Sequence, residues 1–335
     1  MVWGHATSPD LVTWTALTTN NPATWVLKPM TDKGQTWSPF TGSAVAITDA
    51  RASAPPCSCP SGSPCIAAIF TRHSNQTMYQ HQALAPSCHA GMSFDHQGTP
   101  VLDNPEYAAG RIHARDPKVF WFQSPAAAQG KWVMVLAAGD RVRIYDSPTL
   151  VPGSWSHRSD VVIYPRYEIA GPFVETPDLV ELAVENRPGA RPKWALLFGE
   201  GFIPPGICSS IPALPLLSAV RNECKTRLNN PSRGLYLVGD FDGLQFVAES
   251  RPPGGVPGWP LDSGPDFYAA QTWIVARPLS LPSNLQGATR ADPGRPQGAT
   301  PLAAPLPRRV MVGWQNNWRY AHLLPTTEWR GHASI

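Results

Sequence analysis

The chain has 335 residues, a formal net charge of +3 and only 15% charged residues, yet it contains 38 prolines, 27 glycines and 13 tryptophans. The small charge and the lack of a Lys/Arg run exclude the electrostatic footprint of a nucleic-acid-binding protein, and the apolar runs, broken by proline, are too short to cross a membrane. Because Pro and Gly interrupt helices wherever they fall, the composition favours an all-β fold of many short strands.

The N-terminal stretch, 3–14, has the pattern of a strand, a turn and the start of a second strand. The first five residues, Met-Val-Trp-Gly-His, lack the basic start and the apolar segment of a signal peptide. We therefore expect no signal peptide in this stretch.

From residue 40 onward a unit recurs in which a polar or charged opening leads into an apolar run. The openings lie at Phe40, Asp116, Glu175 and Asp266. Further strands are expected after them at 66–70 and 78–84, at 131–136 and 141–145, at 193–198 and 234–238, and at 309–314. The alternation at 141–145 has the period of two that marks a half-buried strand.

Repeated units of three or four strands predict a β-propeller, because such sheets cannot bury both faces alone. We expect one domain over 1–335, with 1–36 as the remnant of an incomplete first blade and 37–335 forming the others, which gives five blades. The first strand of each propeller blade lines the central channel. The polar openings, although distant in sequence, should therefore meet at one mouth of that channel.

The six cysteines lie around two Pro/Ser/Gly-rich loops, at 57, 59, 65 and 88 and at 208 and 224. Disulfides that staple the loops are the favoured interpretation. The alternative is a metal site with His73, His81 or His89, but the Cys-x-Cys-x5-Cys spacing matches no common zinc pattern, so no metal is expected. A glycosylation sequon at 75–77 adds slight support for secretion.

Two carboxylates in different settings suggest acid/base chemistry. Glu175 stands among apolar neighbours, which should raise its pKa toward that of a general acid, whereas Asp116 follows Arg115, whose charge should lower its pKa and keep it ionised. Such a pair is the arrangement used for glycoside hydrolysis. Alone, a Glu before Thr-Pro is more often a loop residue, an Arg-Asp-Pro triplet is often a surface ion pair, and most tryptophans are core residues.

Six motifs in order resemble glycoside hydrolase family 32, the invertases, inulinases and levanases, over nearly the whole chain. They are Trp-Gly-His-Ala at 3–6, Phe-Thr-Gly-Ser-Ala at 40–44, Arg-Asp-Pro at 115–117, Glu-Thr-Pro-Asp-Leu at 175–179, the stretch 262–271, and Gly-Trp-Gln-Asn-Asn-Trp at 313–318. The resemblance implies a secreted enzyme that takes fructose from sucrose or fructans without a cofactor. It also implies a five-bladed propeller, usually followed by a β-sandwich that we expect to be absent from this chain.

The resemblance assigns roles to individual residues. Glu175 matches the general acid/base, and Asp116, with Arg115 beside it, matches the carboxylate that stabilises the oxocarbenium-like transition state through fructose hydroxyls. Residues that match pocket positions are Phe40, Thr41, Asp262 and Trp314. Thr176 and Gln315 stand where Cys and Met are common in the family.

One departure concerns the nucleophile. In the family it is the Asp of a Trp-Met-Asn-Asp-Pro-Asn-Gly motif upstream of Trp-Gly-His-Ala, and the present sequence starts at the later motif. We expect an N-terminally truncated chain that is nearly inactive as it stands, because a retaining mechanism needs both carboxylates. Two alternatives are a non-catalytic protein that binds fructan or sucrose, and an unstable fragment with an exposed sheet edge.

Overall fold

The structure is a computed structural model that describes residues 1–19, 21–47, 65–89, 91–95, 98–124, 127–165, 171–187, 189–202, 215, 232–275, 308–318 and 320–321. Over these residues the chain is all-β, with short 3-10 turns at η1 (Pro22–Thr24) and η3 (Tyr107–Ala109). Within the same ranges, no helix has the length and hydropathy needed to span a bilayer. The all-β prediction is confirmed.

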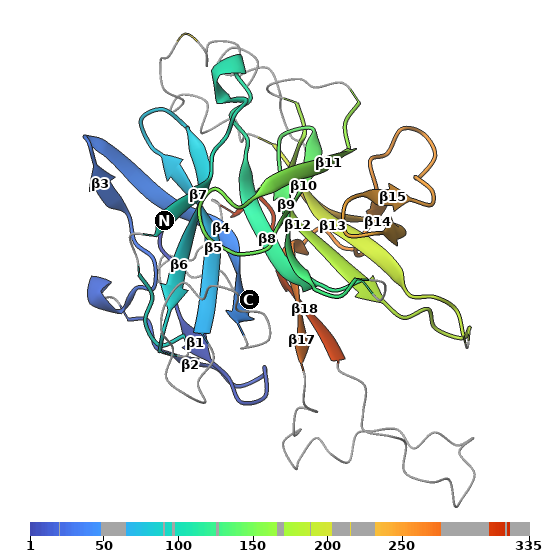
Figure 1. The fold of residues 1–335 in the computed structure, drawn as a ribbon, viewed down its shortest axis with the longest axis horizontal. Helices are drawn as coiled ribbons and strands as arrows, with labels where there is room; N and C mark the ends of the chain where they lie inside the picture. Colours follow the sequence, from blue (N-terminus) through green and yellow to red (C-terminus); the bar gives the residue numbers. More distant parts are fainter. Residues whose placement is uncertain are drawn as a thin grey trace, which may run out of the picture.

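Four antiparallel sheets follow one another along the chain (Figure 1). The first contains β3 (Met30–Asp32), β4 (Gln35–Ile47), β5 (Cys65–Ser74), β6 (Gln80–Ser87) and β7 (Thr99–Leu102). The second contains β8 (Arg115–Phe122), β9 (Lys131–Ala137), β10 (Arg141–Ser147) and β11 (Ser156–Val162). The third contains β12 (Phe173–Leu182), β13 (Lys193–Gly201), β14 (Arg233–Phe241), β15 (Phe246–Ala248) and β16 (Trp259–Pro260), and the fourth contains β17 (Tyr268–Val275) and β18 (Arg308–Trp314).

The N-terminal stretch forms the small hairpin of β1 (Ala6–Thr7) and β2 (Thr15–Ala16), as predicted. The strands expected after each opening are also present. The expected boundary at residue 36 falls inside the β3–β4 pairing, so residues 30–36 share a sheet with the strands that follow. Cys65 and Cys88 are disulfide-bonded, while the other four cysteines lie outside the described residues.

The core lies between the sheets, and strand β9 shows why its sequence is an unbroken apolar run. Val133 and Val135 face one buried cluster, shared with β12 to β14, while Trp132 and Met134 face another, shared with β5 and β6. Successive side chains of a strand point to opposite faces, so a strand covered on both faces needs apolar residues at every position. The sheets therefore stack face to face.

One strand from each of the four sheets contacts its counterpart in the next: β4 contacts β8, β8 contacts β12, and β12 contacts β17. Each of these four strands carries a β-bulge at the same level, where the register shifts after Pro39, Arg115, Glu175 and Tyr268. In β8, for example, Arg115 pairs with Ala137 but Lys118 pairs with Val135, so three steps along β8 face two along β9. The bulge reverses which side of the strand the following residues face.

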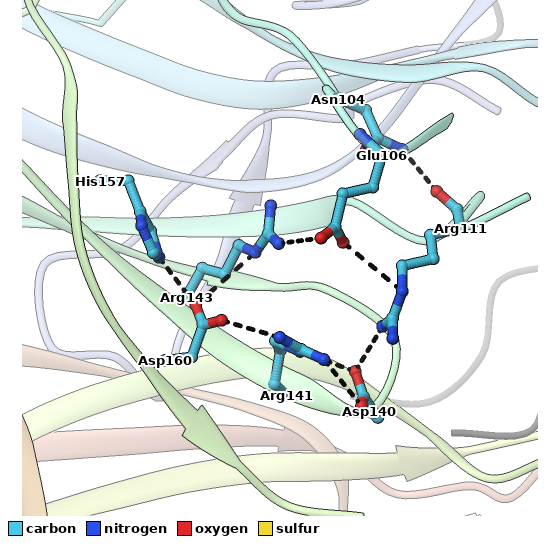
Figure 2. A network of polar contacts seen from close by, with 8 residues as sticks. All are labelled: Asn104, Glu106, Arg111, Asp140, Arg141, Arg143, His157 and Asp160. Atoms are coloured by element: carbon cyan, nitrogen blue, oxygen red, sulfur yellow. Dashed lines mark hydrogen bonds and ion pairs between the residues drawn. The ribbon is translucent and has the colours of Figure 1, made fainter. Parts of the chain in front are cut away.

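A network of charged side chains lies outside this central region and ties the segment before β8 to β10 and β11 (Figure 2). Arg143 contacts Glu106 at 2.7 Å, and Arg141 contacts Asp160 at 2.9 Å. Its other members are Asn104, Arg111, Asp140 and His157. Because its arginines and carboxylates alternate, each charge in it has an opposite neighbour.

Candidate active site

Arg115, the first residue of β8, joins the two carboxylates that the sequence singled out. Its Nη2 donates to Glu175 Oε1 at 2.9 Å, and its Nε lies 3.8 Å from Asp116 Oδ2. The side chains of Arg115 and Asp116 are 8% and 5% exposed, whereas that of Glu175 is 19% exposed. Of the two carboxylates, Glu175 is therefore the more accessible to a ligand.

The bulges aim backbone donors at this site. Asp116 and Thr176 occupy them with φ of 61° and 44°, in the left-handed region that is costly for non-glycine residues. In this geometry the Thr176 N–H donates to Asp116 Oδ2 at 2.9 Å, and the Asp116 N–H donates to Thr71 Oγ1 at 2.9 Å. The backbone strain thus fixes the Asp116 carboxylate between β8 and β12.

Tyr268, the first residue of β17, binds the second carboxylate oxygen of Glu175. It is not among the site residues expected from the sequence. Its hydroxyl donates to Glu175 Oε2, while Arg115 holds Oε1. Burial, and then the charge of Glu175, raise the pKa of Tyr268 well above its ordinary value, so the phenol stays protonated and donates. Tyr268 precedes its bulge as Arg115 and Glu175 precede theirs, and aligning the repeats on that position would have found it.

The expected pKa of Asp116 is wrong in direction. Burial raises it from 3.8 to about 6, against the opposing effect of Arg115 and with a further upward contribution from Glu175. The physical reason is that Arg115 is shared: its closer contact goes to Glu175, and the sheets exclude water from Asp116. Arg115 does lower the pKa of Asp116, as expected, but the desolvation of Asp116 raises it by more.

A second polar layer lies one step beyond the bulges. Lys118 Nζ donates to Asp178 Oδ2 at 2.9 Å, to Gln271 Oε1 at 3.2 Å and to the Thr272 carbonyl at 2.7 Å. Asp178 Oδ2 also accepts from the Thr272 N–H and Oγ1, at 2.8 and 2.9 Å. This layer connects β8, β12 and β17 beneath the residues that hold Glu175.

The predicted pocket residues lie in different settings. The ring of Phe40 stacks on that of His73 with centroids 4.3 Å apart, and the Phe40 carbonyl accepts from Trp3 Nε1. Thr41, the next residue, is exposed. Trp314 is the register partner of Tyr268 and lies 5.0 Å from Trp318 between ring centroids.

Asp262 lies in an exposed turn before β17, where its Oδ2 accepts from the Gly264 N–H at 3.0 Å. Its convergence with Asp116 and Glu175 stays a prediction. Of the two residues that depart from the family pattern, Thr176 is buried, with a hydroxyl that has no partner among the described residues, and Gln315 is exposed.

Burial lowers the pKa of His73 and of His81 to about 4, with nearby arginines acting in the same direction. Both are therefore neutral near neutral pH. Among the described residues, no three His, Cys, Asp or Glu side chains gather in a way that could hold a metal ion.

Comparisons with known proteins identify the family of the chain. The model of the glycosyl hydrolases family 32 N-terminal domain matches residues 1–281. A levanase from Bacillus subtilis is 33% identical over 336 residues, covering 100% of this chain and 38% of that protein. An extracellular exo-inulinase from Meyerozyma guilliermondii is 28% identical over 356 residues, covering 100% of this chain and 49% of that protein. The chain thus spans about half the length, or less, of these curated relatives.

Solved structures of the same family are similar in fold. An exo-inulinase from Aspergillus awamori superposes with a TM-score of 0.62 at 25% identity, covering 97% of this chain and 53% of that one. A fructofuranosidase from Schwanniomyces occidentalis, complexed with fructosylnystose, superposes with a TM-score of 0.54 at 28% identity, covering 81% and 42%. With its family model matched over most of its length and its carboxylates joined by one arginine, the chain belongs to glycosyl hydrolase family 32, a family of glycosidases.

Proposed function

We propose that this site binds a terminal β-D-fructosyl unit of sucrose or a fructan, with Glu175 as general acid/base and Asp116 as the carboxylate that holds the fructose hydroxyls. The supporting observation is the clamp on Glu175, in which Arg115 holds one carboxylate oxygen and Tyr268 the other. Such a clamp fixes the direction in which the carboxyl group delivers a proton. The named substrates of the relatives, levan and inulin, support the same choice.

The reaction we propose is a retaining double displacement. A carboxylate attacks the anomeric carbon as Glu175 gives its proton to the leaving oxygen, and water then hydrolyses the fructosyl-enzyme with Glu175 as the base. The sequence contains no Trp-Met-Asn-Asp-Pro-Asn-Gly motif to supply that nucleophile. We therefore propose that the chain as given binds substrate but turns it over very slowly.

Two further proposals accompany this function. The four sheets and the N-terminal hairpin are parts of a five-bladed propeller, within a single domain. Secretion is proposed from the extracellular exo-inulinases among the relatives.

The test is chemical rescue of the missing nucleophile. Azide or formate at molar concentration can take the place of a carboxylate, attacking the anomeric carbon from the face opposite the leaving group while Glu175 protonates that group. We expect slow glucose release from sucrose that rises with azide and yields a fructosyl azide of inverted configuration. Glu175→Gln should abolish this product, whereas Glu181→Gln, an exposed residue of the same strand, should not.

Each outcome separates the candidates. Fast sucrose hydrolysis without azide would contradict the proposal that the chain as given lacks its nucleophile. Fructose or sucrose binding in calorimetry without any azide product would favour the second candidate, a non-catalytic binding protein, for which the absent motif is the supporting observation. If the chain shows neither binding nor rescue, both candidates are refuted.

A further inference from the structure

His113 lies two residues before the start of β8 and is buried against the site. Its Nδ1 lies 2.5 Å from Arg115 Nη1, and its ring stacks on Phe173 with centroids 4.3 Å apart. The guanidinium carbon of Arg115 also lies 4.8 Å from the centroid of Phe173. His113 and Arg115 therefore share one aromatic surface, supplied by the first residue of β12.

The contact with Arg115 fixes the state of the imidazole. An arginine side chain has only donors, so His113 Nδ1 must accept and the ring must carry its proton on Nε2. Burial lowers the pKa of His113 well below its ordinary value, and the charge of Arg115 acts in the same direction. Its Nε2 is buried with no hydrogen-bond partner in the described part of the chain.

Arg115 is consequently held on three sides. Nη1 donates to His113, Nη2 donates to Glu175, and Nε faces Asp116. Without an acceptor at His113, Nη1 would be a buried charged donor with nothing to bind, which is a costly state. The guanidinium would then turn toward another acceptor and release Glu175.

We propose that His113 is a positioning residue that orients Arg115 and, through it, the Glu175 carboxylate. This inference rests on the proposed function only for its effect on catalysis. The orientation of Arg115 can be tested independently of catalysis. His113 acts on Glu175 only through Arg115, because its polar contact is with the Arg115 guanidinium and not with either carboxylate.

The experiment compares His113→Asn, whose amide oxygen can replace the Nδ1 acceptor, with His113→Leu, which removes it. His81→Leu is the matched control, because His81 is also buried, packs on the ring of Trp37 at 4.9 Å and has an unpartnered Nε2 among the described residues. In NMR spectra of the full chain we expect a neutral His113 protonated on Nε2, and separate Hη signals from a guanidinium of Arg115 that rotates slowly. His113→Leu should merge those signals, while His113→Asn and His81→Leu should retain them.

The same variants are then assayed for azide-rescued turnover of sucrose. His113→Leu should lose roughly tenfold in rate, and His113→Asn should recover most of that loss. His113→Leu with unchanged Arg115 signals, or a His113 protonated on Nδ1, would overturn the proposal. If the unmodified chain shows no rescue, the proposed function fails, and the Arg115 signals still decide the positioning role.

Discussion

Replacing Lys118 by Met should destabilise the protein strongly, because it breaks a buried ion pair from one side only. The side chains of Lys118 and Asp178 are 9% and 1% exposed. Without the ammonium, Asp178 keeps two donors from Thr272 on Oδ2, and its Oδ1 already lacks a partner in the described residues. Removing one member of such a pair costs about 3–5 kcal/mol, a large share of the roughly 5–15 kcal/mol by which a domain is stable.

Urea unfolding followed by tryptophan fluorescence measures this loss, and a double-mutant cycle isolates the pair. Lys118→Met with Asp178→Asn removes both charges yet keeps an acceptor for Thr272, so it should be less destabilising than Lys118→Met alone. Lys193→Met is the control, because its ion pair with Asp240 is exposed and should contribute little. The reasoning is refuted if Lys118→Met and Lys193→Met shift the unfolding midpoint equally.

Three further changes test the site and the charged network outside it. A methyl group at Gly201 would lie 2.5 Å from Glu175 Oε2, so Gly201→Ala should weaken fructose binding in calorimetry. A methyl group at Gly4 would have no neighbour closer than 3.8 Å, so the control Gly4→Ala should leave the affinity unchanged. Equal affinities of the two variants would contradict the close approach of Gly201 to Glu175. Burial raises the pKa of Asp116 above its unfolded value, so its contribution to stability is present below pH 3.8 and lost as the pH rises through about 6. Asp116→Asn should therefore gain up to about 3 kcal/mol at pH 7 and little at pH 4 in urea unfolding, and a loss at pH 7 would refute this. The pKa of Asp160 is lowered: burial acts to raise it, but hydrogen bonds from Arg141 and His157 outweigh burial. Asp160→Asn should therefore destabilise the protein at neutral pH, and progressively less as the pH falls below the ordinary aspartate pKa. A loss of stability that does not depend on pH would contradict this linkage.

Much of the fold could be predicted from the sequence because its strands carry clear apolar patterns. The run 131–136 was expected as a strand, and β9 follows it within a residue. The openings at Phe40, Asp116 and Glu175 were expected on first strands. Asp116 and Glu175 lie in β8 and β12, the first strands of their sheets, whereas Phe40 lies in β4, which follows β3 in its sheet. The fourth differs, since Asp266 precedes β17.

The finer geometry of the site could not be predicted, for two physical reasons. A bulge changes which face a residue occupies without altering the apolar pattern, so the inward direction of Tyr268 and Lys118 was hidden. The pKa of Asp116 depends on how completely the neighbouring sheets exclude water, which adjacent residues do not reveal. Both are properties of how strands meet.

The repeated bulge has a consequence for how this protein can vary. Deleting Pro117 or Pro177 would let β8 or β12 pair as an ordinary ribbon, and no strand need be lost. Deleting Pro177 would displace the Thr176 N–H that donates to Asp116, and deleting Pro117 would displace the Asp116 N–H that donates to Thr71. Either deletion would turn the residues on one side of it to the opposite face of the sheet. The expected product is a more regular pair of sheets that has lost the present arrangement of Arg115, Asp116 and Glu175, so the irregular pairing at this level is a condition of that arrangement.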